Sequence, residues 1–285
     1  MNDHKRDGFS VIEAIIAVFV VGSIATLAWF GLKNNKADAP GSKAPAKQSS
    51  DSNRQTAMKS IVWMSTGEGW QASETPPKCK EPIRFSTPPS DLSTATAILY
   101  PGQTRGGNYK PHGGLRYDNS DGNVTVRAIY DGKLVSGARY IEMGEVQYMF
   151  TVVNDCGIAY RFDHLLTLAP RIQAVMDTLP APQPNNSQTT DFQAPISIKT
   201  GEVVATSVGF PKMKNYSYDL GVYDYRKRNA AAANPSYLEA HRGFLAQAAH
   251  AQCWLTMFSP SDNARLQTLP AGDQANGKTS DYCKN

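Results

Sequence analysis

The stretch YKPHGGLRYDNSDGNVTVRAIYDGKLV, residues 109–135, indicates the fold class of this chain. Short runs of β-branched and aromatic residues alternate in it with Gly and Asp-Gly turn signals. The same pattern continues on both sides, and it predicts strands at residues 95–100, 124–130, 133–135, 146–153, 157–162, 196–198, 202–208 and 217–223. We therefore expect a mainly β protein, with an antiparallel β domain to which short helices are added.

Other stretches interrupt or flank these strands. Residues 165–179 and 235–249 are predicted to be helical, and residues 55–64 to form a short helix-like piece. Residues 180–190, rich in Pro and polar side chains, are predicted to form an exposed loop. One helix is thus expected to interrupt the β domain, and the other to follow it.

The overall composition narrows the class of protein. The 285 residues are 41% hydrophobic and 19% charged, with 22 Gly and 18 Pro, which excludes a wholly disordered, collagen-like or coiled-coil chain. The net charge is +4, from 29 Lys and Arg against 25 Asp and Glu, and no dense basic block occurs. We therefore expect no nucleic-acid partner.

The apolar residues are concentrated near the N-terminus. Residues 9–32 read FSVIEAIIAVFVVGSIATLAWFGL, and Glu13 is their only charged residue. Because about 20 apolar residues cross the bilayer core, this segment is predicted to be a single transmembrane helix. Residues 33–54, with Pro, Ser, Ala and mixed charges, are predicted to be a flexible linker.

The start of the apolar segment resembles a known processing signal. The run Gly8-Phe9-Ser10-Val11-Ile12-Glu13 is similar to the leader junction of type IV prepilins and pseudopilins. The resemblance implies cleavage between Gly8 and Phe9, an assembly role for Glu13, and a bacterial-type inner or cytoplasmic membrane. Pilins continue this helix into an amphipathic half, whereas here the linker follows, so a minor pilin-like subunit or a signal-anchored protein fits better than a fibre-forming pilin.

The four cysteines indicate which side of the membrane holds the C-terminal part. None of them forms a C-x-x-C pair, and their wide spacing does not suggest a zinc knuckle. An even number beyond a membrane span favours two disulfides in an extracytoplasmic domain over four free thiols in a cytoplasmic one. Of three possible connectivities, we favour Cys253 with Cys283 and Cys79 with Cys156.

Four motifs in the β region resemble one enzyme family. Residues 109–115, 126–135, 160–165 (YRFDHL) and 199–205 (KTGEVVA) are similar, in order and spacing, to elements of the lysostaphin-like (LytM-type) zinc endopeptidases, which cut peptidoglycan cross-links. The resemblance covers roughly residues 109–224. It implies the fold of that family for the β domain.

The resemblance also implies where zinc ligands should lie. His112 takes the place of the first ligand, but Arg116 stands where the family has Asp, and a guanidinium cannot bind a cation. The terminal His-x-His falls near residues 216–222, which contain no His. Asp118 and Asp219 are weak substitutes, and Asp118 could instead pair with Arg116. We therefore expect no metal and no other cofactor.

Two histidines remain as candidates for function. In one interpretation His112 and His164 belong to a remnant cleft that binds or polarises a glycan or a peptide. In the other, which we favour with respect to catalysis, they are structural histidines held by hydrogen bonds, near Gly113-Gly114 and Asp163 respectively.

These inferences give one expected organisation. In chain order we expect a leader (1–8), a transmembrane helix (9–32), a linker (33–54), a helical or irregular segment (55–79), a lysostaphin-like β domain (80–229), and a C-terminal segment with helix and a disulfide (230–285).

The expected function is that of a membrane-anchored, extracytoplasmic cell-envelope protein. Its β domain would be catalytically inactive and would bind peptidoglycan or components of a pilus or secretion machinery. Two alternatives stay open. One is a minor pilin or pseudopilin, and the other is an active peptidoglycan metalloendopeptidase with a rearranged zinc site.

Overall fold

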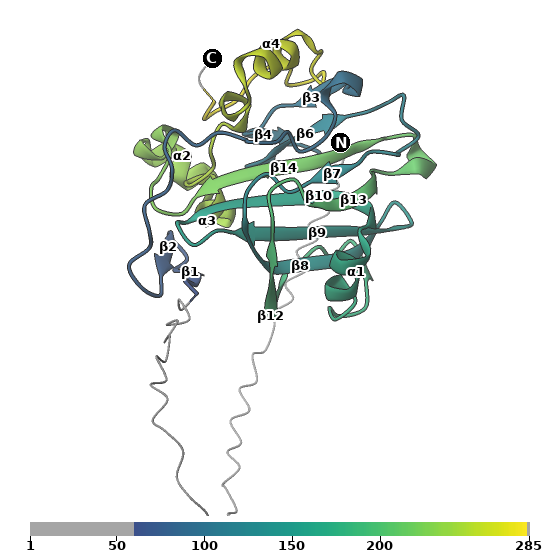
Figure 1. Cartoon of the computed structure of the whole chain (residues 1–285). Coiled ribbons are helices and arrows are strands. Elements are labelled where there is room, and N and C mark those ends of the chain that lie inside the picture. Colours follow the sequence, from purple (N-terminus) through teal and green to yellow (C-terminus); the bar gives the residue numbers. More distant parts are fainter. Residues whose placement is uncertain (1–59, 284–285) are drawn as a thin grey trace, which may run out of the picture. The chain divides into compact units, whose positions relative to one another are not determined.

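Residues 60–283 are the part of the chain that the computed structural model describes, and they form a mainly β fold with short helices (Figure 1). The predicted leader, transmembrane helix and linker, with Gly8, Phe9 and Glu13, lie outside these residues. Within residues 60–283, no helix has the length and apolar character needed to span a bilayer.

A ten-stranded sheet is the main element of the fold. Its strands are β3 (Ala97–Leu99), β6 (Gly113–Arg116), β7 (Val126–Arg127), β8 (Gly132–Glu142), β9 (Glu145–Val153), β10 (Ile158–Leu168), β11 (Gln183–Pro184), β12 (Thr190–Ile198), β13 (Val203–Val208) and β14 (Ser217–Asp224). Along the sheet the order is β11-β8-β9-β10-β14-β6-β3, while β12 pairs with β8 and β13 pairs with β10 and β7. All pairs are antiparallel except β11 with β8.

Two hairpins and several short helices surround this sheet. The hairpins are β1 (Trp63–Ser65) with β2 (Trp70–Ala72), and β4 (Gln103–Arg105) with β5 (Asn108–Lys110). The α-helices are α1 (Pro170–Met176), α2 (Pro235–Ala240), α3 (Leu245–Ala248) and α4 (Pro260–Thr268). The 3₁₀ helices are η1 (Leu92–Thr94), η2 (Pro211–Met213), η3 (Ala230–Ala233), η4 (Arg242–Phe244) and η5 (Trp254–Met257).

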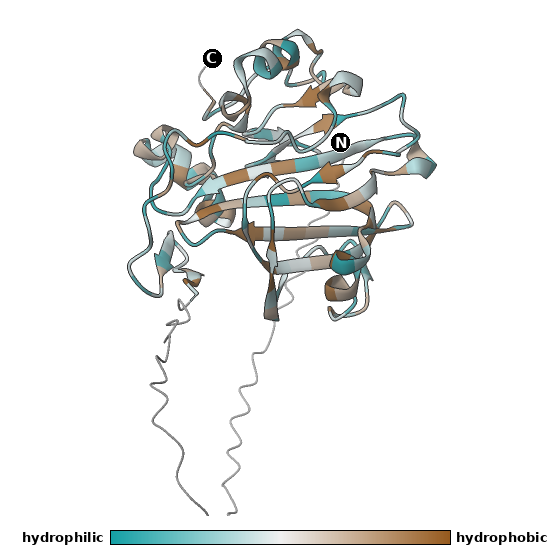
Figure 2. Cartoon of the chain, viewed as in Figure 1, coloured by the Kyte–Doolittle hydropathy of each residue, from teal (hydrophilic) through white to brown (hydrophobic). Residues whose placement is uncertain are grey.

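The two faces of the central strands differ in character. Hydrophobic and hydrophilic residues alternate along them (Figure 2). Tyr160 and Phe162 on β10, and Leu220 and Val222 on β14, belong to the main core. Because successive side chains of a strand point to opposite faces, the residues between them lie on the other face. That second face carries the candidate site.

Residues of the C-terminal segment complete the same core. The core includes Trp254, Phe258 and Leu266 from this segment, and all three are almost fully buried. The structure contains both disulfides, Cys79–Cys156 and Cys253–Cys283, with the pairing favoured from the sequence.

The expectation of a mainly β fold with short helices is confirmed, but two predicted helices are wrong in part. Residues 165–168 continue β10, because they pair with β13, and α1 begins only at Pro170. The piece predicted to be helix-like at residues 55–64 has a strand at its described end, since β1 starts at Trp63 and pairs with β2.

The third predicted helix and the predicted loop also need correction. The zone at residues 235–249 is broken into α2, η4 and α3, and His241, between the first two, has a non-helical backbone. Residues 183–184 of the predicted polar loop form β11, which adds a parallel strand to β8. Both differences arise from tertiary pairing and packing that local sequence patterns do not encode.

Candidate functional site

The candidate site lies where β6, β14 and β10 run side by side. Asp219 on β14 is paired with Gly114 on β6 and with Asp163 on β10. A Cβ atom at Gly114 would lie 2.4 Å from the Tyr218 carbonyl oxygen and 2.9 Å from Asp219 Oδ1. A residue without a side chain is therefore needed at position 114 to leave room for the Asp219 carboxylate.

His112 and Asp219 form the centre of the site. His112 Nε2 lies 2.9 Å from Asp219 Oδ2, and both side chains are less than one-tenth exposed. The pKa of His112 is lowered to about 4, first because burial disfavours its charged form, and despite the opposing effect of Asp219. Neutral His112 therefore donates from Nε2 to Asp219, and His112 Nδ1 is buried with no partner among the described residues.

The Asp219 carboxylate stays ionised in this setting. Burial alone would raise its pKa, but the interactions with His112 and the electrostatic effects of His164 and Arg105 outweigh burial and lower the pKa. Arg105 lies near because its guanidinium donates to the main-chain oxygens of Tyr100 and His112. The centre of the site is thus an anion next to a neutral imidazole, with guanidinium charges around them.

A β-bulge adds His164 to the same face. The pairing of β10 with β9 shifts between Phe162 and Leu165, and His164 has a left-handed backbone with φ of 58°. A bulge of this kind lets two successive side chains share one face. His164 Nε2 consequently lies 3.8 Å from Asp219 Oδ2, and His164 Nδ1 lies 3.2 Å from the Tyr140 hydroxyl.

A second buried ion pair lies beside this centre. Arg161 Nη2 is 2.5 Å from Asp163 Oδ2, and Tyr140 donates to Asp163 Oδ1 at 2.6 Å. Burial would raise the pKa of Asp163, but the electrostatic effects of His164 and Arg161 and the hydrogen bond from Tyr140 lower it. Arg161 Nε is buried and has no hydrogen-bond partner in the described part of the chain.

Arg116 and Asp118 form the ion pair expected from the sequence. Arg116 Nη2 lies 2.8 Å from Asp118 Oδ1, and Asp118 also accepts from the Thr96 hydroxyl. Within residues 60–283, the guanidinium of Arg116 is not bonded to His112 or Asp219. Of the candidate residues, His112, His164 and Asp219 thus come together, whereas Asp118 lies apart.

The donor set does not match the zinc site of the resembled family. Such a site needs three protein ligands around an open position. Arg116 supplies no electron pair, Asp219 is hydrogen-bonded to His112, and the guanidinium groups of Arg105 and Arg161 stand nearby. No group of three or more His, Cys, Asp or Glu within the described part could hold a metal ion.

Sequence reasoning did not identify Arg161 and Tyr140 as site residues. The alternation of β10 contains the signal for Arg161, because Arg161 and Asp163 share a face and interrupt a run of core residues. Nothing in the local sequence indicates Tyr140. It lies on β8, and its side chain reaches Asp163 on β10 across the intervening strand β9.

A groove continues from Arg161 along the same face. Its volume is about 780 Å³, and its lining includes residues 60–65 together with Thr189, Asp191, Phe192 and Pro195. Arg161 and Tyr223 are among the residues that line it from β10 and β14. We call this hollow the groove below.

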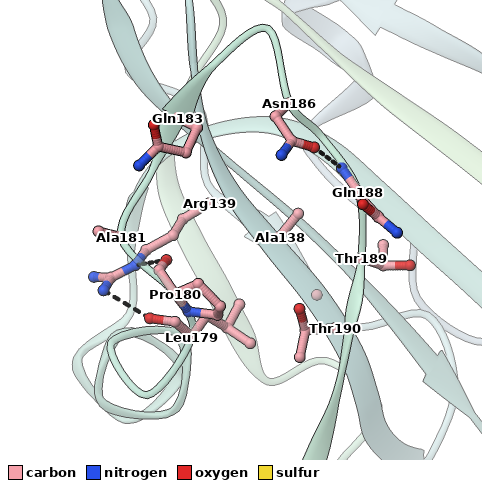
Figure 3. Close-up of a pocket in the computed structure, with 11 residues that line it drawn as sticks. Ala138, Arg139, Leu179, Pro180, Ala181, Gln183, Asn186, Gln188, Thr189 and Thr190 are labelled. Carbon is pink, nitrogen blue, oxygen red and sulfur yellow. Dashed lines mark hydrogen bonds between the residues drawn. The ribbon is translucent and has the colours of Figure 1, made fainter. Parts of the chain in front are cut away.

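A smaller hollow of about 300 Å³ lies against β8 and β11 (Figure 3). Its lining is mostly neutral, and its one charged side chain, Arg139, donates to the main-chain oxygens of Leu179 and Pro180. Because that charge is already satisfied, this hollow offers less chemistry than the groove.

Comparison with known proteins adds no assignment: no protein-family model matches the chain, and no curated protein matches it.

Proposed function

We propose that this chain is a membrane-anchored, extracytoplasmic protein of the bacterial cell envelope. Its anchor would be residues 9–32, and its β domain would act as a binding or assembly module and not as an enzyme. The two disulfides support an oxidising compartment for this domain. The binding target would be peptidoglycan or a component of a pilus or secretion machinery.

The single observation that carries the non-enzymatic part is the direct hydrogen bond between His112 and Asp219, 2.9 Å long. It engages the residue at the first zinc-ligand position of the lysostaphin-like resemblance in a hydrogen bond to a carboxylate. Arg161 and Arg105 add positive charge near His112, which disfavours the binding of a metal cation there. The site therefore suits polar or anionic groups of a ligand.

Metal content and cleavage test this proposal. The full-length chain, purified in detergent under oxidising conditions, would be analysed for bound zinc and incubated with purified peptidoglycan sacculi. We expect no stoichiometric zinc, no released fragments, and retention of the protein on sacculi or with envelope filaments. About one zinc per chain, with cleavage that His112→Ala abolishes, would instead establish the endopeptidase with a rearranged site.

The pilin alternative makes a separate prediction about the N-terminus. Under it, cleavage after Gly8 and co-purification with filaments are expected, and Glu13→Ala should reduce incorporation. An intact leader on the protein recovered from membranes would count against it.

A further inference from the structure

One wall of the groove is the edge of a β-strand. Residues 60–65 line the groove, and they include all three residues of β1, although the side chains of a strand point alternately to opposite sides. All residues of a strand can line a hollow only when the main-chain edge of the strand faces that hollow. β1 therefore presents its backbone to the groove.

That edge of β1 has free hydrogen-bonding groups. Ser73 N donates to Val62 O, and Thr66 N donates to Gly69 O, so even-numbered residues of β1 bond toward β2. In an antiparallel pair, the alternate residues then direct N–H and C=O groups to the opposite edge. These are Trp63 and Ser65, and β1 pairs with no second strand among the described residues.

The other wall is also irregular. The pairing of β12 with β8 is interrupted between Asp191 and Ile196. Phe192 and Pro195 of this interrupted stretch line the groove. They provide apolar contacts opposite the free edge of β1.

The floor of the groove holds two buried polar atoms that have no partner within residues 60–283. These are Arg161 Nε and the Tyr223 hydroxyl, and both residues line the groove. Buried donors are normally satisfied, and leaving one unpaired costs free energy. A guanidinium N–H beside a hydroxyl suits a carboxylate, because charge-assisted hydrogen bonds to carboxylates are the strong ones for Arg.

The free edge is held in place by two tryptophans of the hairpin. Trp70 stacks on Tyr225 with ring centroids 3.7 Å apart, and Trp70 Nε1 donates to Ala246 O at 3.0 Å. Trp63 Nε1 donates to Asp155 O at 3.3 Å. A fixed edge reduces the ordering cost of binding an extended ligand.

We propose that the groove binds an extended L-peptide segment of a partner protein, which pairs with the free edge of β1 and places a carboxylate on Arg161. This inference rests on the proposed binding function and names its ligand class. Residues 60–65, of which β1 comprises the last three, extend over at most about 20 Å, so the segment would be up to about six residues long. The stem peptides of a bacterial wall, which mix D- and L-residues, cannot continue such a ladder, because D-residues favour mirror-image backbone angles.

Peptide selection by the full-length chain in detergent tests this proposal. The probes are a bead library of six-residue L-peptides with free carboxyl ends and the mirror-image D-library. We expect enrichment of L-peptides that carry a carboxylate, and about tenfold or greater loss of affinity for a selected peptide when its carboxylate is replaced by an amide. Arg161→Gln should cause a similar loss, whereas Arg171→Gln, on an exposed surface ion pair, should not.

A second measurement keeps the test independent of the stability of the Arg161 variant. In the wild-type chain, hydrogen exchange at the Trp63 and Ser65 amides should slow when a selected peptide is bound. No enrichment of L-peptides over D-peptides, or binding without protection of these amides, would overturn the proposal. Retention on sacculi or filaments with no peptide selection would overturn this inference alone, whereas zinc with cleavage would overturn the proposed function.

Discussion

Lowering the pH from 7 to 5 should destabilise the β domain through His112. Its pKa in the folded protein is lowered to about 4 from an ordinary value of 6.5. As the pH falls, the unfolded chain therefore binds a proton at this residue before the folded chain does. Stability from this source is present above pH 6.5 and is lost as the pH falls toward about 4.

The size of the effect follows from the two pKa values. Proton linkage with 6.5 and about 4 gives a loss of about 2 kcal/mol between pH 7 and pH 5. The pKa values of Asp219 and Asp163 are lowered from 3.8, so these carboxylates contribute only at more acidic pH. Among the residues of the cluster whose pKa is lowered, His112 is therefore the one whose proton uptake affects stability between pH 7 and pH 5.

Urea denaturation at several pH values measures this loss. The comparison is between the wild-type domain, residues 57–285, and His112→Gln, in which the amide nitrogen can still donate to Asp219 but takes up no proton. Between pH 7 and pH 5, we expect the free energy of unfolding to fall by about 2 kcal/mol less in the variant than in the wild type. An equal loss in both proteins would refute the burial of a neutral His112.

Two further predictions concern the packing around the site and the C-terminal segment. Gly114→Ala places a Cβ 2.4 Å from a carbonyl oxygen and 2.9 Å from Asp219 Oδ1. Thermal unfolding should therefore show that this variant loses about 2 kcal/mol of folding stability. The control is Gly243→Ala, which has no atom within 4 Å of the new Cβ and should change stability little. Equal midpoints for the two variants would contradict the close approach at Gly114. Replacing Cys253 and Cys283 by Ser together opens a loop with a sequence separation of 30 and should cost roughly 3–4 kcal/mol in urea denaturation; an unchanged midpoint would show that this disulfide does not constrain the chain.

The sequence by itself determined the class of the fold and most strand positions. Turn signals and β-branched runs placed strands near β3, β9, β13 and β14, because these segments combine a period of two with clear boundaries. The resemblance to the lysostaphin-like enzymes pointed to His112, His164 and Asp219 as candidates, whereas the number of cysteines indicated two disulfides but left three possible pairings. The strands depend on residue type and local spacing, which a sequence states directly.

Only the tertiary structure decided how those residues meet. Residues 165–168 continue a strand because β13 pairs with them, which overrides a helix-like local pattern. The bulge at His164 turns its side chain to the same face as Asp163, and the register of β14 places Asp219 against both. The groove needs the edge of β1 and the floor of β10, about 100 positions apart in sequence. Such placements depend on strand register and close packing between distant segments, and local patterns along the chain do not specify them.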